Sequence, residues 1–306
     1  MYMTSTVKKI LGYYESDNPG TKNNIAKILM HGHLAGSGRL VILPVDQGFE
    51  HGPARSFMIN PAAYDPHYHF QLAVDAGLSA FAAPLGLLEA GANTFAGALP
   101  LILKMNSSNS LTTIKDQAFT STVKDALRLG CVAVGLTIYP GADQSYEMIE
   151  EGREIIAEAK SCGLAAVIWS YPRGPSLSKN GETALDVCAY AAHIAALMGA
   201  HIIKVKIPSN YIEQEEAKKL YQAQQTRYEH LSERIAHVVE ACFNGRRLVV
   251  FSGGATKESD PLLLEARAIL DGGGNGSIIG RNCFQRPRQE ALQLLENLIA
   301  IYLGKK

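Results

Sequence analysis

Short runs of consecutive apolar residues recur along the chain, and longer stretches of mixed polarity separate them. Eight such runs lie at residues 40–46, 78–84, 99–106, 131–140, 164–172, 201–208, 247–254 and 276–282. Continuous apolar runs of this length are typical of parallel strands that are buried on both faces, since neither face of such a strand meets water. The pattern therefore predicts eight parallel strands.

The stretches between these runs have the apolar spacing of helices. In residues 145–163 the apolar side chains fall on one stripe, made of Met148, Ile149, Ile155, Ile156 and Ala159. Gly163 ends this stretch as a helix C-cap would. Similar patterns at residues 184–200, 214–245 and 288–304 predict further helices.

Eight alternating strand and helix units predict a (β/α)₈ TIM barrel. We expect one domain over residues 1–306, with the barrel in 39–306 and an N-terminal helical extension in 1–38. The extension is expected to form a helix around Asn23–Met30 near the bottom of the barrel. A doubly wound open sheet is the alternative, but no G-x-G-x-x-G follows the first strand.

Composition agrees with a large folded core, since 47% of the 306 residues are hydrophobic and 19% are charged. The formal net charge is zero, so no basic excess indicates nucleic acid or an anionic membrane as a partner. A phosphorylated small molecule is still compatible with a neutral protein. The chain has no apolar stretch near the ~20 residues that a membrane span needs, and no signal peptide is evident.

The five cysteines are scattered, odd in number and without a C-x-x-C pair. They predict reduced thiols in a cytoplasmic protein, and they do not form a zinc motif or a disulfide framework.

Two lysines, Lys204 and Lys206, interrupt the apolar run at 201–208. Because strand side chains alternate between faces, both lysines share a face, and the apolar Ile203 and Val205 occupy the other. The apolar face suits packing against helices, so the lysines are predicted to point into the barrel. An inward lysine can neutralise an acid, or it can act as a nucleophilic amine when burial and a second cation lower its pKa.

Other polar residues fall at the predicted carboxyl ends of strands, where barrels of this kind carry their chemistry. They are Asp46, Lys104, Asn106, Tyr139, Trp169, Tyr171, Arg173, Ser252, Gly253, Gly254, Gly280, Arg281 and Asn282. The small residues at 252–257 and the Gly-Arg-Asn at 280–282 are suited to a phosphate group at strands seven and eight. The alternative is that these glycines only form tight turns.

The remaining candidates have two interpretations each. Lys104 can pair with an inward acid or take part in catalysis directly. Asp46, Glu50 and His51 could ligate a metal or could form a hydrogen-bonded rim. The Gly-, Pro- and Ser-rich segment 170–182 could be a lid or a plain loop.

Seven short motifs carry a family resemblance. They occur in the order LPVDQGFEHGP, LILKMN, GLTIYPG, WSYPRG, GAHIIKVK, SGG and GRN, from Leu40 toward the C-terminus. Together they resemble the class I fructose-1,6-bisphosphate aldolases of the archaeal type, which also occur in bacteria. The N-terminal 38 residues and the SGGATK segment differ in detail from the short archaeal members.

The resemblance implies reversible cleavage of fructose 1,6-bisphosphate in glycolysis and gluconeogenesis, by a cytoplasmic homo-oligomer that needs no metal and no other cofactor. It implies that Lys204 forms the Schiff base, that Tyr171 transfers protons and that Asp46 assists imine formation. The substrate-binding residues it implies are Trp169, Lys206, Arg173, Lys104, His51, Ser252, Gly253, Gly254, Gly280 and Arg281, with Lys206 tuning the site and Arg173 near the second phosphate.

Three other functions remain open from the sequence. Related Schiff-base barrels act as transaldolase-like enzymes or thiolases on other sugar phosphates. A metal-dependent barrel would use Asp46, Glu50 and His51, and a non-catalytic barrel would only bind a sugar phosphate.

Overall fold

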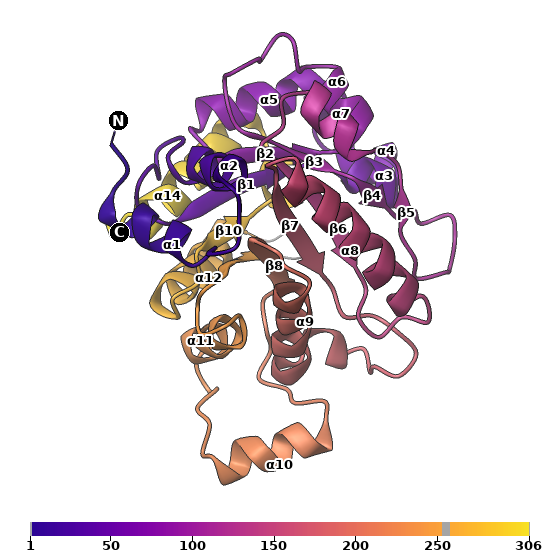
Figure 1. Ribbon diagram of the computed structural model, residues 1–306, viewed down its shortest axis with the longest axis vertical. Helices are drawn as coiled ribbons and strands as arrows, with labels where there is room; N and C mark the ends of the chain where they lie inside the picture. The colour runs from indigo at the N-terminus through magenta and orange to yellow at the C-terminus, as the bar shows by residue number, and fades with distance from the viewer. Residues whose placement is uncertain (1, 253–257, 306) are drawn as a thin grey trace.

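A computed structural model describes residues 2–252 and 258–305 of the protein. Eight parallel strands close into a barrel in the order β1-β10-β9-β8-β7-β6-β3-β2, and helices surround it (Figure 1). The barrel strands are β1 (Leu40–Pro44), β2 (Ala80–Ala83), β3 (Leu101–Lys104), β6 (Ala133–Ile138), β7 (Ala165–Ser170), β8 (Ile202–Lys206), β9 (Leu248–Ser252) and β10 (Gly276–Ile278). Each lies within one predicted run, so the predicted (β/α)₈ barrel is confirmed.

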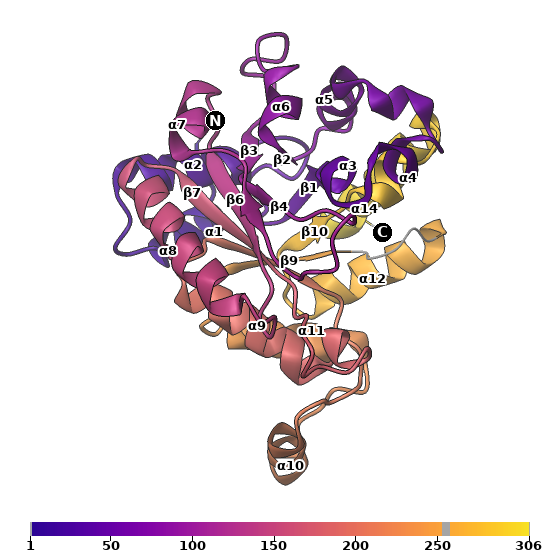
Figure 2. The same cartoon turned by 90° about the vertical axis from the view of Figure 1, so that its right-hand side faces the viewer.

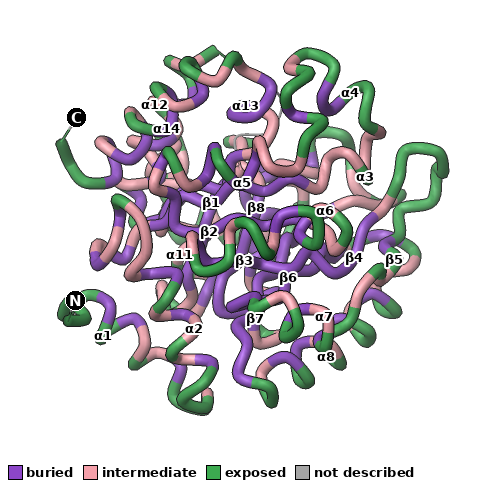
Figure 3. Tube along the Cα trace, turned by 90° about the horizontal axis from the view of Figure 1, so that it is seen from above, coloured by how far each residue is buried: buried purple, intermediate pink, exposed green. Residues whose placement is uncertain are grey.

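Residues of each strand alternate between two apolar layers. Leu40, Ile42, Val167 and Ile202 belong to the cluster inside the barrel. Their neighbours along the strands pack in the outer layer against the helices, as Ile203 does. The barrel strands are buried except at Lys206 and Ser252, which end β8 and β9 and are partly exposed (Figure 3). The alternation that was expected for the run with the two lysines is therefore confirmed, and it fixes which side chains of this strand can reach the barrel interior.

The outer layer consists of helices that follow the strands. They are α5 (Pro66–Asp75), α6 (Leu85–Glu89), α7 (Val123–Arg128), α8 (Ser145–Ser161), α9 (Leu185–Leu197), α11 (Leu231–Ala241), α12 (Ser259–Asp271) and α14 (Arg288–Tyr302). Gly163 follows α8 with φ +81°, as expected for a helix C-cap. Among the described residues, no helix combines the length and the apolar character that crossing a membrane requires.

Short elements line the carboxyl end of the barrel. They are the helices α3 (Gln47–His51), α4 (Pro53–Phe57) and α13 (Arg281–Phe284), the 3₁₀ turns η1 (Pro61–Tyr64) and η2 (Gly181–Thr183), and the strands β4 (Asn106–Ser107) and β5 (Ala118–Phe119). The two short strands pair antiparallel as a small hairpin outside the barrel sheet. Sequence periodicity did not predict this hairpin, because two-residue strands have no period to detect.

The N-terminal extension forms two helices, α1 (Ser5–Gly12) and α2 (Pro19–Leu29), where one helix around Asn23–Met30 was expected. The side chains of Thr4 and Asn18 cap them by accepting hydrogen bonds from backbone amides of their first turns. Val7 and Ile25 belong to the same apolar cluster as the inward residues of the strands. The expected location is correct, because the extension closes the bottom of the barrel.

The stretch 214–245 was expected to be helical throughout, but it forms α10 (Glu215–Ala223) and α11. Gln225 has φ +52° between them, a left-handed conformation that ends a helix. Figure 2 shows α10 standing away from the barrel, and it has no buried residue.

Candidate active site

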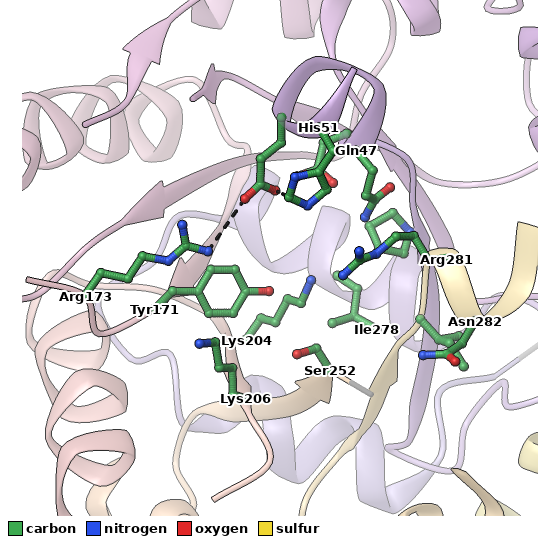
Figure 4. Close-up of a pocket in the computed structure, with 15 residues that line it drawn as sticks. Gln47, His51, Tyr171, Arg173, Lys204, Lys206, Ser252, Ile278, Arg281 and Asn282 are labelled. Carbon is green, nitrogen blue, oxygen red and sulfur yellow. Dashed lines mark ion pairs between the residues drawn. The ribbon is translucent and has the colours of Figure 1, made fainter. Parts of the chain in front are cut away.

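The barrel mouth contains a pocket with about 710 Å³ of empty space. Its lining comes from residues after β1, from β8 and β9, and from the segments that follow β7 and β10. Figure 4 shows Lys204, Tyr171 and Arg281 directed toward the middle of this pocket. Parallel strands bring residues from distant parts of the sequence together here because their carboxyl ends all lie at one end of the barrel.

Lys204 lies inside the barrel and is only 5% exposed. Its Nζ atom lies 5.6 Å from the centre of the Trp169 ring and 5.4 Å from that of Tyr171. Among the described residues, no carboxylate lies within 4.0 Å of this nitrogen, and the pocket opens in front of it. Burial, assisted by the charges of Lys104 and Arg281, lowers its pKa to about 8, although Asp46 and Glu50 act in the opposite sense. Such a lysine can supply a free amine.

Lys206 also lines the pocket, but its contacts differ from the expectation. It is 25% exposed and forms an ion pair of 3.1 Å with Glu182, which lies in η2. The cations that lower the pKa of Lys204 most are Lys104 and Arg281. We expected Lys206 to lower the pKa of Lys204. In the structure Lys104, from β3 on another side of the barrel, has this effect.

Lys104 is buried beside Trp169, with Nζ 5.8 Å from the ring centre. It donates hydrogen bonds to the backbone oxygen and to Oδ1 of Asn106. No ion pair joins it to an acid in the part of the chain that the structure describes, so the alternative in which Lys104 pairs with an inward acid is not found there. Burial lowers its pKa to about 8.

Trp169 lies deeper than expected. It is 1% exposed and packs in the inner apolar cluster, below the pocket and beside Lys104 and Lys204. A side-chain carbon on Gly135 would come within 2.3 Å of the indole ring, so only glycine leaves room for the ring there. Trp169 therefore supports the two lysines from the interior and does not line the main pocket.

Tyr171 follows β7 and is partly buried. Burial raises the pKa of its hydroxyl well above the ordinary value, and Asp46 and Glu50 raise it further, whereas a hydrogen bond with Ser252 and the charge of Arg173 lower it. In this state the hydroxyl is protonated, and it becomes an effective acid only when a nearby positive charge, such as an iminium at Lys204, lowers its pKa.

The acidic and basic groups of the segment after β1 reach over the pocket. Glu50 lies 3.6 Å from Arg173 and 3.7 Å from His51 (Figure 4). The Arg173 guanidinium also stacks on the Tyr139 ring, 4.6 Å from its centre. Burial lowers the pKa of His51. The described residues contain no group of three or more His, Cys, Asp or Glu side chains arranged to hold a metal ion, so Asp46, Glu50 and His51 do not form such a group.

The predicted phosphate region is partly described. Ser252, Gly280 and Arg281 line the pocket from β9 and from the turn after β10. A side-chain carbon on Gly280 would lie 2.8 Å from the Pro44 oxygen, so glycine is needed where β10 meets the segment after β1. Gly253 and Gly254, with the rest of 253–257, lie outside the described residues.

Some lining residues escaped the sequence analysis. Gln47 lines the pocket next to Asp46, and adjacency to that acid was the only signal for it. Ser107 and Gln117 line a second recess beside the first. The β4–β5 hairpin brings them there, and nothing in the local sequence indicates it.

A closed parallel barrel, with a buried amine at its mouth that has no carboxylate partner in residues 2–252 and 258–305, defines a lysine-dependent (β/α)₈ enzyme as the class of this protein. The profile of the DeoC/LacD family of aldolases matches residues 40–286, and the chain belongs to this family.

Within this family, the chain is similar to proteins named as class 1 fructose-bisphosphate aldolases. The chain is 36% identical to "Probable fructose-bisphosphate aldolase class 1" of Chlamydia muridarum, over 95% of this chain and 87% of the relative. It is 35% identical to "Fructose-bisphosphate aldolase class 1" of Thermoproteus tenax, over 89% and 93%. These matches confirm the resemblance to the archaeal-type class I enzymes.

The chain is also similar to a solved structure of an archaeal enzyme. It is a fructose-1,6-bisphosphate aldolase whose catalytic lysine is covalently bound to the carbinolamine intermediate of its substrate. The chain superimposes on it with a TM-score of 0.76 at 32% identity, covering 92% of this chain and 99% of the other.

Proposed function

We propose that this protein is a class I fructose-1,6-bisphosphate aldolase, which reversibly cleaves the ketose bisphosphate into dihydroxyacetone phosphate and glyceraldehyde 3-phosphate. One observation carries the proposal: Lys204 is an inward, buried amine with no carboxylate partner among the described residues, at the open end of the barrel. The similarity to named class 1 aldolases supports this substrate over another sugar phosphate.

The proposed reaction begins with the attack of the Lys204 amine on the C2 carbonyl. Asp46 moves a proton from the nitrogen to the oxygen of the carbinolamine. Tyr171 then donates its proton to the departing hydroxyl, so water leaves and an iminium forms beside a phenolate. The positive charge of the iminium stabilises this phenolate, because an adjacent cation lowers the pKa of a hydroxyl.

Cleavage follows from the iminium. The Tyr171 phenolate accepts the proton of the C4 hydroxyl, the C3–C4 bond breaks, and its electron pair enters the enamine while the aldehyde departs. Tyr171 returns the proton to C3. Water then adds to the iminium, and proton transfers reverse the first steps to release dihydroxyacetone phosphate and the free amine. The iminium is the electron sink, so the proposed enzyme needs no metal.

We assign the substrate-binding roles by position. The phosphate on the ketone half is assigned to Ser252, Gly280 and Arg281, which line the pocket. The family resemblance adds Gly253 and Gly254, which lie outside the described residues. Arg173 lies on the other side of the pocket from Arg281 (Figure 4) and is assigned to the second phosphate, for which it must leave Glu50. His51 lies between Glu50 and Arg281 and is assigned to contacts with the substrate there. Trp169 packs against both Lys104 and Lys204 and holds them in place, and Lys206 forms part of the pocket lining.

We further propose that the enzyme is a homo-oligomer in the cytoplasm and that it acts in glycolysis and gluconeogenesis. The five cysteines are unpaired, four of them buried, as expected in a reducing compartment. Its named relatives support the metabolic role.

Borohydride reduction in the presence of dihydroxyacetone phosphate tests this function. We expect one irreversible adduct on the peptide that carries Lys204, with the same yield after treatment with a chelator. An adduct on Lys206 would show that the lysine is assigned wrongly. Absence of any adduct, or its loss with chelator, would contradict the mechanism.

Two variants separate chemistry from folding. Lys204→Ala should abolish both the adduct and cleavage while the fold persists. Tyr171→Phe should still form the adduct, more slowly because another acid must protonate the departing hydroxyl, and should cleave about 10²–10⁴-fold more slowly, the usual contribution of a positioned proton donor. Normal turnover of Tyr171→Phe would exclude its role in proton transfer.

A further inference from the structure

A second, smaller recess opens beside the main pocket, and its empty space, counted together with the open solvent at its mouth, is about 280 Å³. Asp46, Glu50 and Tyr171 line both spaces, so the two are adjacent at the reacting centre. The phosphate region lies along β9, β10 and β1, whereas the recess is lined from β3, the β4–β5 hairpin and β6. A substrate bound to Lys204 with one phosphate at Arg281 therefore has the recess on its other side.

The recess contains polar atoms that have no partner in residues 2–252 and 258–305. These atoms are Ser107 Oγ and Gln117 Oε1, and each residue is only 6% exposed. Leaving such groups buried and unpaired is costly, so each of them calls for a partner such as a ligand, an ion or a water. Lys104 adds a donor, because an ammonium has three N–H groups and Asn106 accepts from it at two atoms.

The walls of the recess are held rigidly. Asn106 in β4 donates from Nδ2 to the Thr137 oxygen at 2.8 Å and accepts from the Thr137 amide at 2.7 Å. Ser107 pairs with Ala118 in the hairpin, and Gln117, which precedes Ala118, lies beside Tyr139 in the wall of the recess. Ser107 and Gln117 are therefore presented by a preorganised hairpin, which is what recognition of a small ligand requires.

Charge decides what kind of group fits. Asp46 and Glu50 place two carboxylates at the recess against the one cation of Lys104. A phosphate there would be repelled, whereas neutral hydroxyl groups can donate to Gln117 and exchange hydrogen bonds with Ser107.

We propose that this recess is the subsite for the hydroxylated carbons of the aldehyde half of the substrate, and that Ser107 and Gln117 recognise the hydroxyl next to the aldehyde carbon. The proposal rests on the aldolase function proposed above. It makes the β4–β5 hairpin a determinant of which aldehydes the enzyme accepts, separate from the phosphate contacts.

The condensation reaction tests this role. The donor is dihydroxyacetone phosphate, and the acceptor is either glyceraldehyde 3-phosphate or 3-oxopropyl phosphate, which lacks only the hydroxyl in question. The unchanged enzyme should prefer the hydroxylated acceptor in kcat/KM. Ser107→Ala and Gln117→Leu should each reduce that preference by about two- to tenfold, the value of one hydrogen bond.

Two measurements serve as controls: the melting temperature, which reports on folding, and the trapped adduct, which reports on binding of the ketone half of the substrate. Ser107 Oγ has no partner among the described residues, so Ser107→Ala should leave the melting temperature and the borohydride-trapped adduct with dihydroxyacetone phosphate unchanged. Ser110→Ala, on the exposed turn of the same hairpin, should leave the preference unchanged.

Other outcomes overturn the proposal. An equal loss with both acceptors would make the hairpin purely structural, and no change would show that the recess does not hold the substrate hydroxyl. If either of these two outcomes is found while the adduct at Lys204 still forms normally, the proposed aldolase function stands and only the proposed role of the recess is wrong. If the unchanged enzyme forms no adduct, both proposals fail.

Discussion

At the scale of single residues, the reactivity of Lys204 depends on its position and its neighbours. The β8 backbone directs it inward, burial disfavours its ammonium form, and Lys104 from β3 adds a second cation. Lys206 differs because Glu182 neutralises it in a more exposed place. Two lysines that look equivalent in the sequence therefore have different environments, and only one is suited to form an imine.

The pKa of Lys204 leads to a prediction about pH. A pKa of about 8 means that the free amine increases as pH rises through this value, so the rate of adduct formation with dihydroxyacetone phosphate should rise and then level off above it. Lys104→Met removes a charge that lowers the pKa, so its midpoint should move to higher pH. The measurement is the rate of borohydride-trapped labelling against pH.

A matched substitution controls for the loss of a positive charge. Lys206→Met removes a charge that Glu182 already balances, so the midpoint should move less than in Lys104→Met. If the labelling rate of Lys104→Met had the same pH midpoint as that of the unchanged enzyme, Lys104 would not lower the pKa of Lys204.

At the scale of elements, polar contacts fasten the N-terminal helices to the strand that carries Lys204. The Tyr14 hydroxyl donates to the backbone oxygen of His201 at 2.7 Å, just before β8. Asp17 forms an ion pair with Lys160 at 3.0 Å and accepts a hydrogen bond of 2.8 Å from Nε2 of His201. Through its Nδ1 atom, the His201 ring accepts from the Ala166 amide in β7. The extension thus holds the amino ends of two neighbouring strands in register.

Asp17→Asn tests this fastening. Burial alone would raise the pKa of Asp17, but hydrogen bonds and charges from His201 and Lys160 lower it to about 2. Removing the charge leaves Lys160 without its partner, so we expect a loss of about 2–4 kcal/mol in the free energy of unfolding, measured with denaturant near neutral pH.

The pH dependence of this loss provides a second check. A carboxyl whose pKa is lowered by folding stabilises the protein above its ordinary pKa of 3.8. That contribution disappears as pH falls toward about 2, so the difference between the two proteins should shrink in acid. Glu154→Gln, which breaks an exposed pair with Arg153, should change stability by less than about 0.5 kcal/mol. Equal costs for the two substitutions would contradict the argument.

At the scale of the whole molecule, we propose that residues 1–306 form one domain, because the extension supplies part of the barrel core. Six of its apolar side chains belong to the inner cluster and are almost fully buried: Val7, Ile10, Tyr14, Ile25, Ile28 and Leu29. Burying each contributes about 1.5–3 kcal/mol. Their sum is comparable to the whole net stability of a typical domain, about 5–15 kcal/mol.

A truncated chain that begins at Arg39 tests the single domain. It should fail to fold, as judged by the near-ultraviolet circular dichroism of its aromatic residues, whereas the full chain should unfold in one transition. A stable, active truncated barrel would show that the extension is a separate unit. Recovery of structure when residues 1–38 are added as a peptide would support the single core.

Local sequence determined the strands and the direction of their side chains. Consecutive apolar residues and alternation by two are properties of neighbouring positions, so the eight strands and the inward face of Lys204 could be predicted without knowing what they touch. The same local rules could not predict α1 or the break between α10 and α11, since short helices depend on what they pack against and turns on single backbone angles.

The tertiary structure alone decided which groups meet. That Lys104 tunes Lys204, that Glu182 holds Lys206, that Trp169 lies beneath both buried lysines, and that Ser107 and Gln117 reach a common recess all depend on closure of the barrel. Closure places residues from distant parts of the chain within a few ångströms of one another. Charge and hydrogen bonding act over that distance in space, whatever the separation in sequence.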